Sequence, residues 1–224
     1  MEGVRLAARL RDGRVRFGFV HGNCALDNST TPDHCGVTRE LDALRKAGCY
    51  ADFTFPSLGS PAQPSKVNSI YYAADDDAPK SYDTGSDARV GERVLNQLLM
   101  FQGPTTLTPT RRLLECGAIE NDARPSPDRE DNWVAARVCV KGRPDWIFVK
   151  VYTHGAQSRT TCLGPETDAM FGRLERRYGR GGHRLHYVTA REAYNIVRAA
   201  EDGLTGDPDN FRDYEVTQPR NKHQ

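Results

Sequence analysis

Apolar and β-branched stretches alternate with segments of helical periodicity along the chain. Strands are predicted where Val, Ile, Phe and Tyr cluster and turn residues follow, at residues 15–20, 49–55, 69–73, 95–102, 146–152 and 185–188. Helices are predicted at 38–47, 127–138, 165–178 and 190–201, together with a short basic helix at 4–11. Because strands alternate with helices, the pattern predicts an α/β protein with a mainly parallel sheet.

Turn and capping residues separate these elements. Thr38, or a residue just before it, is the expected N-cap of the first long helix, and Ser126 that of the second. The acidic segment 75–91 has no periodicity, and a long ordered loop of this kind is more often functional than idle. The polar segment after Gly203 is expected to be loosely held. We therefore predict one domain over residues 1–203 and a tail over 204–224.

Size and charge narrow the class of protein. The 224 residues are 38% hydrophobic and 27% charged, which is enough for a core in a single domain. Lys plus Arg number 31 against 30 Asp plus Glu, so the net charge of +1 gives no overall field for nucleic acid or an anionic membrane. No apolar run is long enough to span a bilayer, and the first residues lack the apolar core of a signal peptide. We expect a cytoplasmic protein.

The cysteine spacing matches no close metal-binding or redox pair. In a reducing compartment the six cysteines are expected to be thiols rather than disulfides. Cys49 and Cys139 lie in apolar surroundings and are assigned to the core. Cys24 and Cys35 flank a polar loop, and their alternative interpretation is as metal ligands or a reactive thiol.

Two predicted strands end on His-Gly, at His21 and at His154. In parallel α/β architectures ligands bind at the carboxyl ends of the strands, so both histidines are expected at one rim. Together with Asp27 or Asp33 they would form a two-histidine, one-carboxylate metal site with an open coordination position, which is typical of a hydrolase. The alternative is that each histidine makes a local hydrogen bond and that the two never meet.

Several longer strings resemble a known family. They include Phe17–Ser29, Cys35-Gly-Val, Gly48–Ser57, Asn68–Ala73, Pro79-Lys-Ser81, Phe148–Ala156 and His186–Asn195. These strings resemble bacterial polysaccharide-deacetylase-like proteins, which are relatives of the NodB-type carbohydrate esterases. The resemblance runs from about residue 13 to about residue 214. It implies a distorted (β/α) barrel and a divalent metal, often zinc, that serves to hydrolyse N-acetyl or O-acetyl groups on sugars.

The family's paired-aspartate and His-x-x-x-His metal motifs are not found before Val15. The chain therefore resembles the C-terminal part of such a domain, and we expect an incomplete or distorted barrel of mainly parallel strands. The segment Tyr152-Thr153-His154 resembles the family's Leu-x-His motif, whose histidine is the general acid. The loop His21-Gly22-Asn23 would occupy the place of the family's Arg-x-Pro-Tyr motif without its residues.

Our leading hypothesis is a metal-dependent hydrolase that removes acetyl groups, bound as amide or ester, from a saccharide. The expected metal is zinc, held by His21 and His154, with His154 and Asp27 as catalytic residues. The saccharide is assigned to Asn23, Asn28, Tyr72 and Lys80. Tyr71, Tyr72 and Trp146 are candidate sugar platforms whose alternative place is the core.

The alternative function is a non-catalytic module that binds a saccharide or a protein partner and has lost the metal site. An incomplete barrel exposes strand edges, so we expect a homo-oligomer or a partner chain that completes the sheet.

Overall fold

The computed structural model describes residues 8–10, 13–108 and 114–218, with backbone only at 9 and 10. The chain divides into two compact units, which we describe separately. Unit 1 comprises Met1–Gln102, Cys139–Trp146 and Val188–Gln224, and unit 2 comprises Gly103–Val138 and Ile147–Tyr187. The expectation of one domain over 1–203 stays a prediction.

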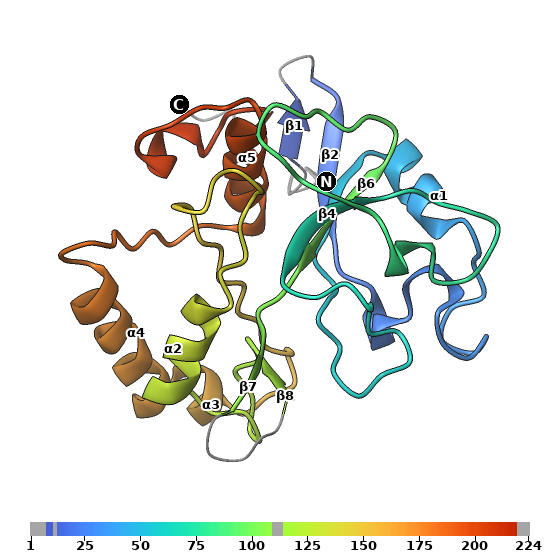
Figure 1. Cartoon of the computed structure of the whole chain (residues 1–224). Coiled ribbons are helices and arrows are strands. Elements are labelled where there is room, and N and C mark those ends of the chain that lie inside the picture. The colour runs from blue at the N-terminus through green and yellow to red at the C-terminus, as the bar shows by residue number, and fades with distance from the viewer. Residues whose placement is uncertain (1–7, 11–12, 109–113, 219–224) are drawn as a thin grey trace, which may run out of the picture. The chain divides into compact units, whose positions relative to one another are not determined.

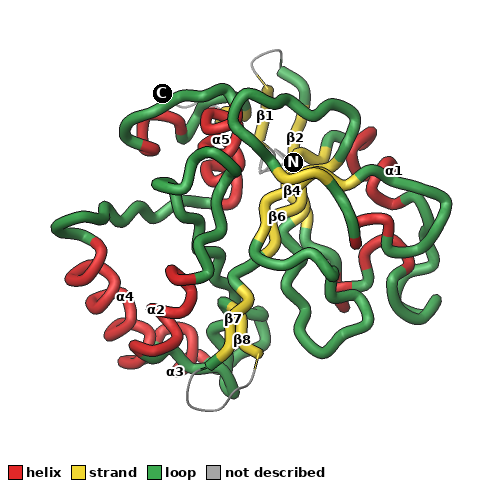
Figure 2. Tube along the Cα trace, viewed as in Figure 1, coloured by secondary structure: helices red, strands yellow, loops and turns green. Residues whose placement is uncertain are grey.

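Unit 1 is built on a mixed β-sheet (Figure 1). Its five principal strands follow the order β5 (Ser86–Asp87), β4 (Ser69–Ala73), β6 (Leu98–Gln102), β3 (Cys49–Asp52) and β2 (Val15–Phe19). Beyond β2 the sheet continues through the short strands β1 (Ala8–Leu10) and β9 (Val216–Thr217). Long loops join these strands, with short 3-10 turns in several of them (Figure 2).

The sheet is only partly parallel, which corrects the prediction of mainly parallel strands. β3 runs parallel to β2 and to β6, whereas the β4–β6, β4–β5, β1–β2 and β1–β9 pairs are antiparallel. The parallel pair β3 and β6 is connected by residues 53–97, which contain β4 and β5 but none of the α-helices that usually form such a crossover. Within this connection β4 runs antiparallel to β6 and lies beside it. The described residues form no closed barrel, so the barrel expectation is not confirmed.

Two helices cover opposite faces of this sheet, as Figure 1 shows. They are α1 (Glu40–Ala47), which packs on β3 and β6, and α5 (Ala190–Glu201), which contacts β2. Side chains alternate along a strand, so Tyr71 of β4 joins the core under α1 while Tyr72 bonds to Glu201 of α5 at 3.0 Å. Because both faces are covered, every residue of β4 and β6 is buried.

Unit 2 holds a β-hairpin and three helices. They are β7 (Thr105–Leu107), β8 (Leu114–Cys116), α2 (Pro127–Ala135), α3 (Arg159–Leu163) and α4 (Pro165–Tyr178). Its core is small and consists of Ile119, Trp133 and Met170, with Leu174 packed against them. Arg129 lies over the Trp133 ring and donates hydrogen bonds to four backbone carbonyls, so one guanidinium ties α2 to the chain that precedes it.

Most predicted helices are confirmed, but the prediction of two strands was wrong. Residues 146–152 are apolar and β-branched, yet they form only the isolated bridge between Ala118 and Tyr152, and Val149 and Val151 remain exposed. Residues 185–188 form no ladder. A sequence with strand propensity becomes a strand only where a partner strand runs beside it. Of the predicted helix 4–11, residues 8–10 are strand β1, and the others lie outside the described residues.

The segment after Gly203, for which composition predicts loose attachment, is bonded to α5 as far as Val216. Asn195 of α5 is fully buried and bonds to this segment with both ends of its amide. Its nitrogen donates to the carbonyls of Arg212 and Val216, each at 2.7 Å, and its oxygen accepts the N–H groups of Glu215 and Val216. Arg191 donates to the same two carbonyls, so two side chains of α5 hold the segment between η4 (Pro208–Phe211) and β9.

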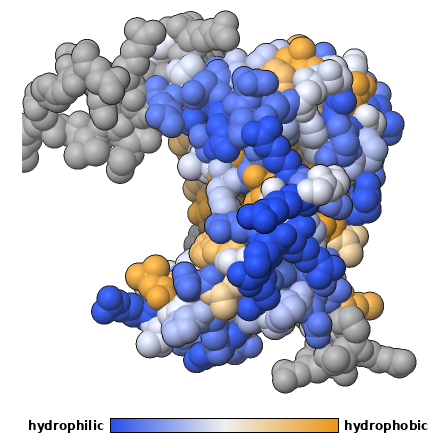
Figure 3. Space-filling model, turned by 90° about the vertical axis from the view of Figure 1, so that its left-hand side faces the viewer, coloured by the Kyte–Doolittle hydropathy of each residue, from blue (hydrophilic) through white to orange (hydrophobic). Residues whose placement is uncertain are grey.

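No described helix is long and apolar enough to cross a membrane. The face that Figure 3 shows is mostly hydrophilic, with hydrophobic residues in separate small groups. No disulfide forms between the cysteines, as expected. Cys49 is buried and Cys139 is half-buried.

We predict that Asn195→Ala lowers the free energy of unfolding by about 3 kcal/mol, because two peptide N–H groups lose their acceptor inside the protein. Urea unfolding followed by circular dichroism measures this loss. Asn210→Ala is the matched control, because Asn210 is an exposed residue of η4, and should change stability by less than about 0.5 kcal/mol. Equal stability of the two variants would contradict this anchoring role.

A second prediction concerns Arg93, whose guanidinium bonds to Asp202 and lowers the pKa of that carboxyl below its usual value. The pairing then adds stability above about pH 4 that is lost as the pH falls. The stability difference between wild type and Arg93→Gln should therefore shrink between about pH 6 and about pH 3. Arg89→Gln removes a solvent-exposed pair with Glu92 on the same loop, which contributes little to stability, and should show a much weaker trend in parallel unfolding curves.

Candidate functional site

The loop that leaves β2 is tightly wound. It contains the 3-10 turns η1 (Gly22–Cys24) and η2 (Leu26–Asn28). Asn23, Cys24, Asp27 and Asn28 all have φ between 52° and 56°, in the left-handed region. Asn and Asp tolerate this region better than other side chains, since their short polar groups can bond locally. The residue types of the loop thus permit a compact path that brings its two ends together.

Asp27 organises this loop from inside the protein, where its side chain is 0% exposed. One carboxylate oxygen accepts the Ser81 N–H at 2.8 Å and the Ser81 hydroxyl at 2.7 Å. The other accepts the N–H of Glu40 at 3.2 Å, while the backbone N–H of Asp27 donates to the Glu40 carboxylate at 2.7 Å. Both oxygens of Asp27 are therefore engaged by its own chain, which is a positioning arrangement. Its predicted catalytic role stays a prediction.

Helix α1 begins on these contacts rather than on the predicted cap. Its N-cap residue is Arg39, in the left-handed conformation with φ 66°, and neither Arg39 nor Thr38 caps the helix with its side chain. The carboxylates of Asp27 and Asp75 accept the N–H groups of Glu40 and Asp42 instead. Negative groups at this end of a helix are favourable for its dipole. Burial raises the pKa of Asp75 above its usual value.

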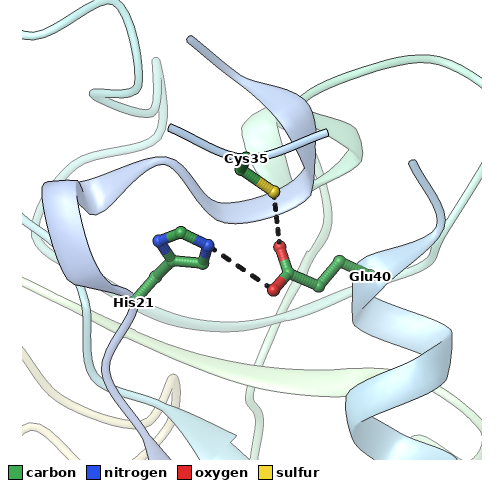
Figure 4. A group of neighbouring side chains, drawn as sticks. All are labelled: His21, Cys35 and Glu40. Carbon is green, nitrogen blue, oxygen red and sulfur yellow. Dashed lines mark hydrogen bonds and ion pairs between the residues drawn. The ribbon is translucent and has the colours of Figure 1, made fainter. Parts of the chain in front are cut away.

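His21, Cys35 and Glu40 meet beside this helix start, and Figure 4 shows their side chains turned toward one another. The His21 Nε2 atom lies 3.6 Å from Glu40 Oε1, and the Cys35 Sγ atom lies 3.5 Å from Glu40 Oε2. The three ligand atoms all lie within 4.8 Å of one another. Cys35 is buried, and the side chains of His21 and Glu40 are 13% and 14% exposed. A nitrogen, a sulfur and a carboxylate are the donors that zinc takes in proteins.

The ring of His21 is oriented by its neighbours. Its Nδ1 contacts the carbonyl oxygen of Gly22, and its edge meets the Phe19 ring at a centroid distance of 5.9 Å. Its backbone N–H donates to Thr54 Oγ1 at 2.8 Å, and Thr54 donates in turn to the buried Asp52 at 2.8 Å. His21 follows β2 and Thr54 follows β3, so this cluster lies at the carboxyl ends of two neighbouring parallel strands.

The residues assigned to the saccharide fall in different places. Asn23 is exposed on η1. Asn28 is half-buried, and its side-chain oxygen has no hydrogen-bond partner among the described residues. The backbone N–H of Lys80 donates to the Asp27 carbonyl at 2.8 Å. The side-chain ammonium of Lys80 lies 3.3 Å from the Asp83 carboxylate. These contacts bring Asn28 and Lys80 to the loop that also carries His21.

The three aromatic candidates are buried. Tyr71 and Tyr72 are 0% and 3% exposed, and their hydroxyls bond to Tyr82 and Glu201. Trp146 is 6% exposed and packs beside Phe211. A sugar platform needs an exposed ring face, so the core alternative accounts for these residues. Burial beneath the two helices is the physical reason that Tyr72 does not serve as a platform.

His154 belongs to unit 2, where its side chain is 68% exposed. Its Nδ1 pairs with the carboxylate of Glu120, and its ring meets the Tyr152 ring edge-on at 6.1 Å. Asp33, the other carboxylate considered beside His21, is exposed on the loop of unit 1. The predicted metal site that combines His21 with His154 stays a prediction.

Sequence reasoning missed Glu40. Its position reads as the ordinary first turn of an amphipathic helix, and nothing in the local pattern distinguishes it. The available signal is Cys35, for which a metal ligand is one interpretation and which lies five residues before Glu40. Only the closure of the loop by Asp27 brings both residues to His21.

Comparison with models of known protein families gave no match, and neither did comparison with curated proteins or with solved structures.

We predict that Asp27→Asn lowers the free energy of unfolding by about 2 kcal/mol, since the amide places an NH2 group against an N–H donor of Glu40 or Ser81. Asn still tolerates the left-handed backbone, so the effect isolates the carboxylate. Asp33→Asn, at an exposed position of the same loop, is the control and should change stability by less than about 0.5 kcal/mol in denaturant unfolding. A stable Asp27→Asn variant would show that the carboxylate does not hold the loop.

Proposed function

We propose that the protein is a metal-dependent hydrolase that removes acetyl groups, in amide or ester linkage, from a saccharide. The observation that carries the proposal is the convergence of His21, Cys35 and Glu40 at the carboxyl ends of two parallel strands. This edge of an α/β sheet is where ligands bind, because the variable loops gather there. The resemblance of the chain's longer strings to polysaccharide-deacetylase-like proteins supports the saccharide as substrate.

A metal ion bound there would supply Lewis acidity, polarising the acetyl carbonyl and lowering the pKa of water. The residues of the chain have separate roles. Asp27 holds the Glu40 carboxylate through its backbone N–H, and the Gly22 carbonyl fixes the ring of His21. Asn28 and Lys80 lie beside the same loop and would contact the sugar.

The sequence-based assignment of His154 as general acid is supported by its surroundings within unit 2. Glu120 pairs with the Nδ1 atom of His154, and the exposed ring leaves Nε2 able to donate a proton. A carboxylate that orients a histidine and stabilises its protonated form is a common device in such catalysis. This role needs the ring at the surface, as it is in unit 2.

The test is acetate release from N-acetylated and O-acetylated oligosaccharides by the zinc-loaded protein. Chelation should abolish release, and added Zn²⁺ should restore it. We predict that His154→Ala lowers the rate about 100-fold or more while leaving the bound metal unchanged. His183→Ala, another exposed histidine of unit 2, is the matched control and should retain wild-type activity.

Loss of activity in both histidine variants would not support the specific role of His154. No acetate release by a metal-loaded, folded wild type would contradict the hydrolase and favour the non-catalytic binding module.

A further inference from the structure

We propose that His21, Cys35 and Glu40 form a complete three-ligand zinc site within unit 1, whose fourth position is left for water or substrate. The proposal rests on the proposed function for the role of the ion, whereas the ligand set is argued from unit 1 alone. It differs from the sequence-based expectation, because Cys35 and Glu40 take the places assigned to His154 and a loop aspartate.

The first argument is the direction of lone pairs. A neutral imidazole has one N–H, and the contact of Nδ1 with the Gly22 carbonyl uses it. In the neutral tautomer with its N–H on Nδ1, Nε2 carries a lone pair that faces Glu40 Oε1 at 3.6 Å, so that one acceptor faces another. A cation between them satisfies both atoms. A backbone carbonyl on the second ring nitrogen is also the usual partner of a metal-bound histidine.

The second argument is spacing. Zinc lies about 2.0 Å from nitrogen and oxygen ligands and about 2.3 Å from sulfur. Tetrahedral angles then place N and O about 3.3 Å apart, and S and O about 3.5 Å apart. The observed separations are 3.6 Å between His21 Nε2 and Glu40 Oε1, and 3.5 Å between Cys35 Sγ and Glu40 Oε2, so each partner faces a different oxygen of the carboxylate. One ligand atom from each residue lies within 4.8 Å of the other two, and side-chain rotation would bring the three onto one ion.

The third argument is charge. Glu40 and the buried Asp27 lie together, and in the described part of the chain no Lys or Arg forms an ion pair with either. Buried negative groups without a cation are costly. When Cys35 binds, its S–H bond breaks, the proton passes to the solvent, and the thiolate forms the S–Zn bond. A divalent ion held by His21, Cys35 and Glu40 would place positive charge beside both carboxylates.

The fourth argument is selectivity. Mg²⁺ and Ca²⁺ take oxygen ligands, whereas thiolate and imidazole favour zinc and related transition metals. Asp27 holds Glu40 in place through two hydrogen bonds, so the site is partly organised before the ion binds. Three protein ligands and one open position are the arrangement of catalytic rather than structural zinc sites.

The test is metal binding by the full chain, with Zn²⁺ and Co²⁺ as the probes. Wild type should bind one Zn²⁺ per chain in preference to Mg²⁺, and the Co²⁺ form should show a cobalt–thiolate charge-transfer band. Cys35→Ser should lose the band, and His21→Ala and Glu40→Gln should weaken Zn²⁺ binding by about 100-fold or more. Cys162→Ser, a half-buried thiol of unit 2, is the control and should keep both band and affinity.

A second measurement needs no variant. X-ray absorption of the zinc-loaded wild type should show one sulfur at about 2.3 Å and nitrogen or oxygen ligands at about 2.0 Å. Absence of sulfur, or a band that persists in Cys35→Ser, would overturn the site. Zinc bound through sulfur without acetate release would defeat the proposed function and leave the site standing. Acetate release that persists in Cys35→Ser would overturn this ligand set and leave the hydrolase.

Discussion

The arrangement around the candidate site depends on one buried carboxylate. Asp27 lies in the interior in a left-handed conformation, and it accepts hydrogen bonds from the start of α1 and from Ser81 while its own N–H reaches Glu40. Three segments that are distant in sequence are therefore fixed by a single side chain. Burying a carboxylate without a counter-ion costs free energy of folding. This cost is offset if the negative charge of Asp27 also favours the binding of a cation at the surface next to it.

The neighbouring atoms are consistent with the binding of a cation there. The loop after β2 brings an imidazole nitrogen and a thiol to the two oxygens of the Glu40 carboxylate. The same contacts that stabilise the loop also fix the direction of Glu40. The hydrogen bonds of Asp27 therefore determine both the stability of the loop and the geometry of the site, so a substitution that changes one also changes the other.

Elements specified by local signals were predictable from the sequence. Helix α4 starts at Pro165, and α5 has a Thr189–Glu192 capping box, so both boundaries could be placed correctly. Strand β4 was found as well, and β6 lies within the predicted strand 95–102, but the short strand β5 and the antiparallel pairing of β4 were not predicted. The direction of a strand depends on the connections between strands, which no local pattern encodes. The apolar run 146–152 was predicted as a strand but has no partner strand beside it among the described residues.

For the site, His21 was found from its place after a strand, whereas Glu40 depends on a buried contact with Asp27 that no local pattern encodes.

The order of the sheet has a consequence for synthesis on the ribosome. Strands β2, β3, β4 and β6 all emerge within the first 102 residues, but α5 and β9 come only after the whole of unit 2 has been made. Until then one face of the nascent sheet lacks the helix that covers it, and β1 lacks its outer neighbour. An exposed apolar sheet face is a binding surface for chaperones and for other nascent chains. The rate of elongation through residues 103–187 would therefore set how long unit 1 remains vulnerable to aggregation.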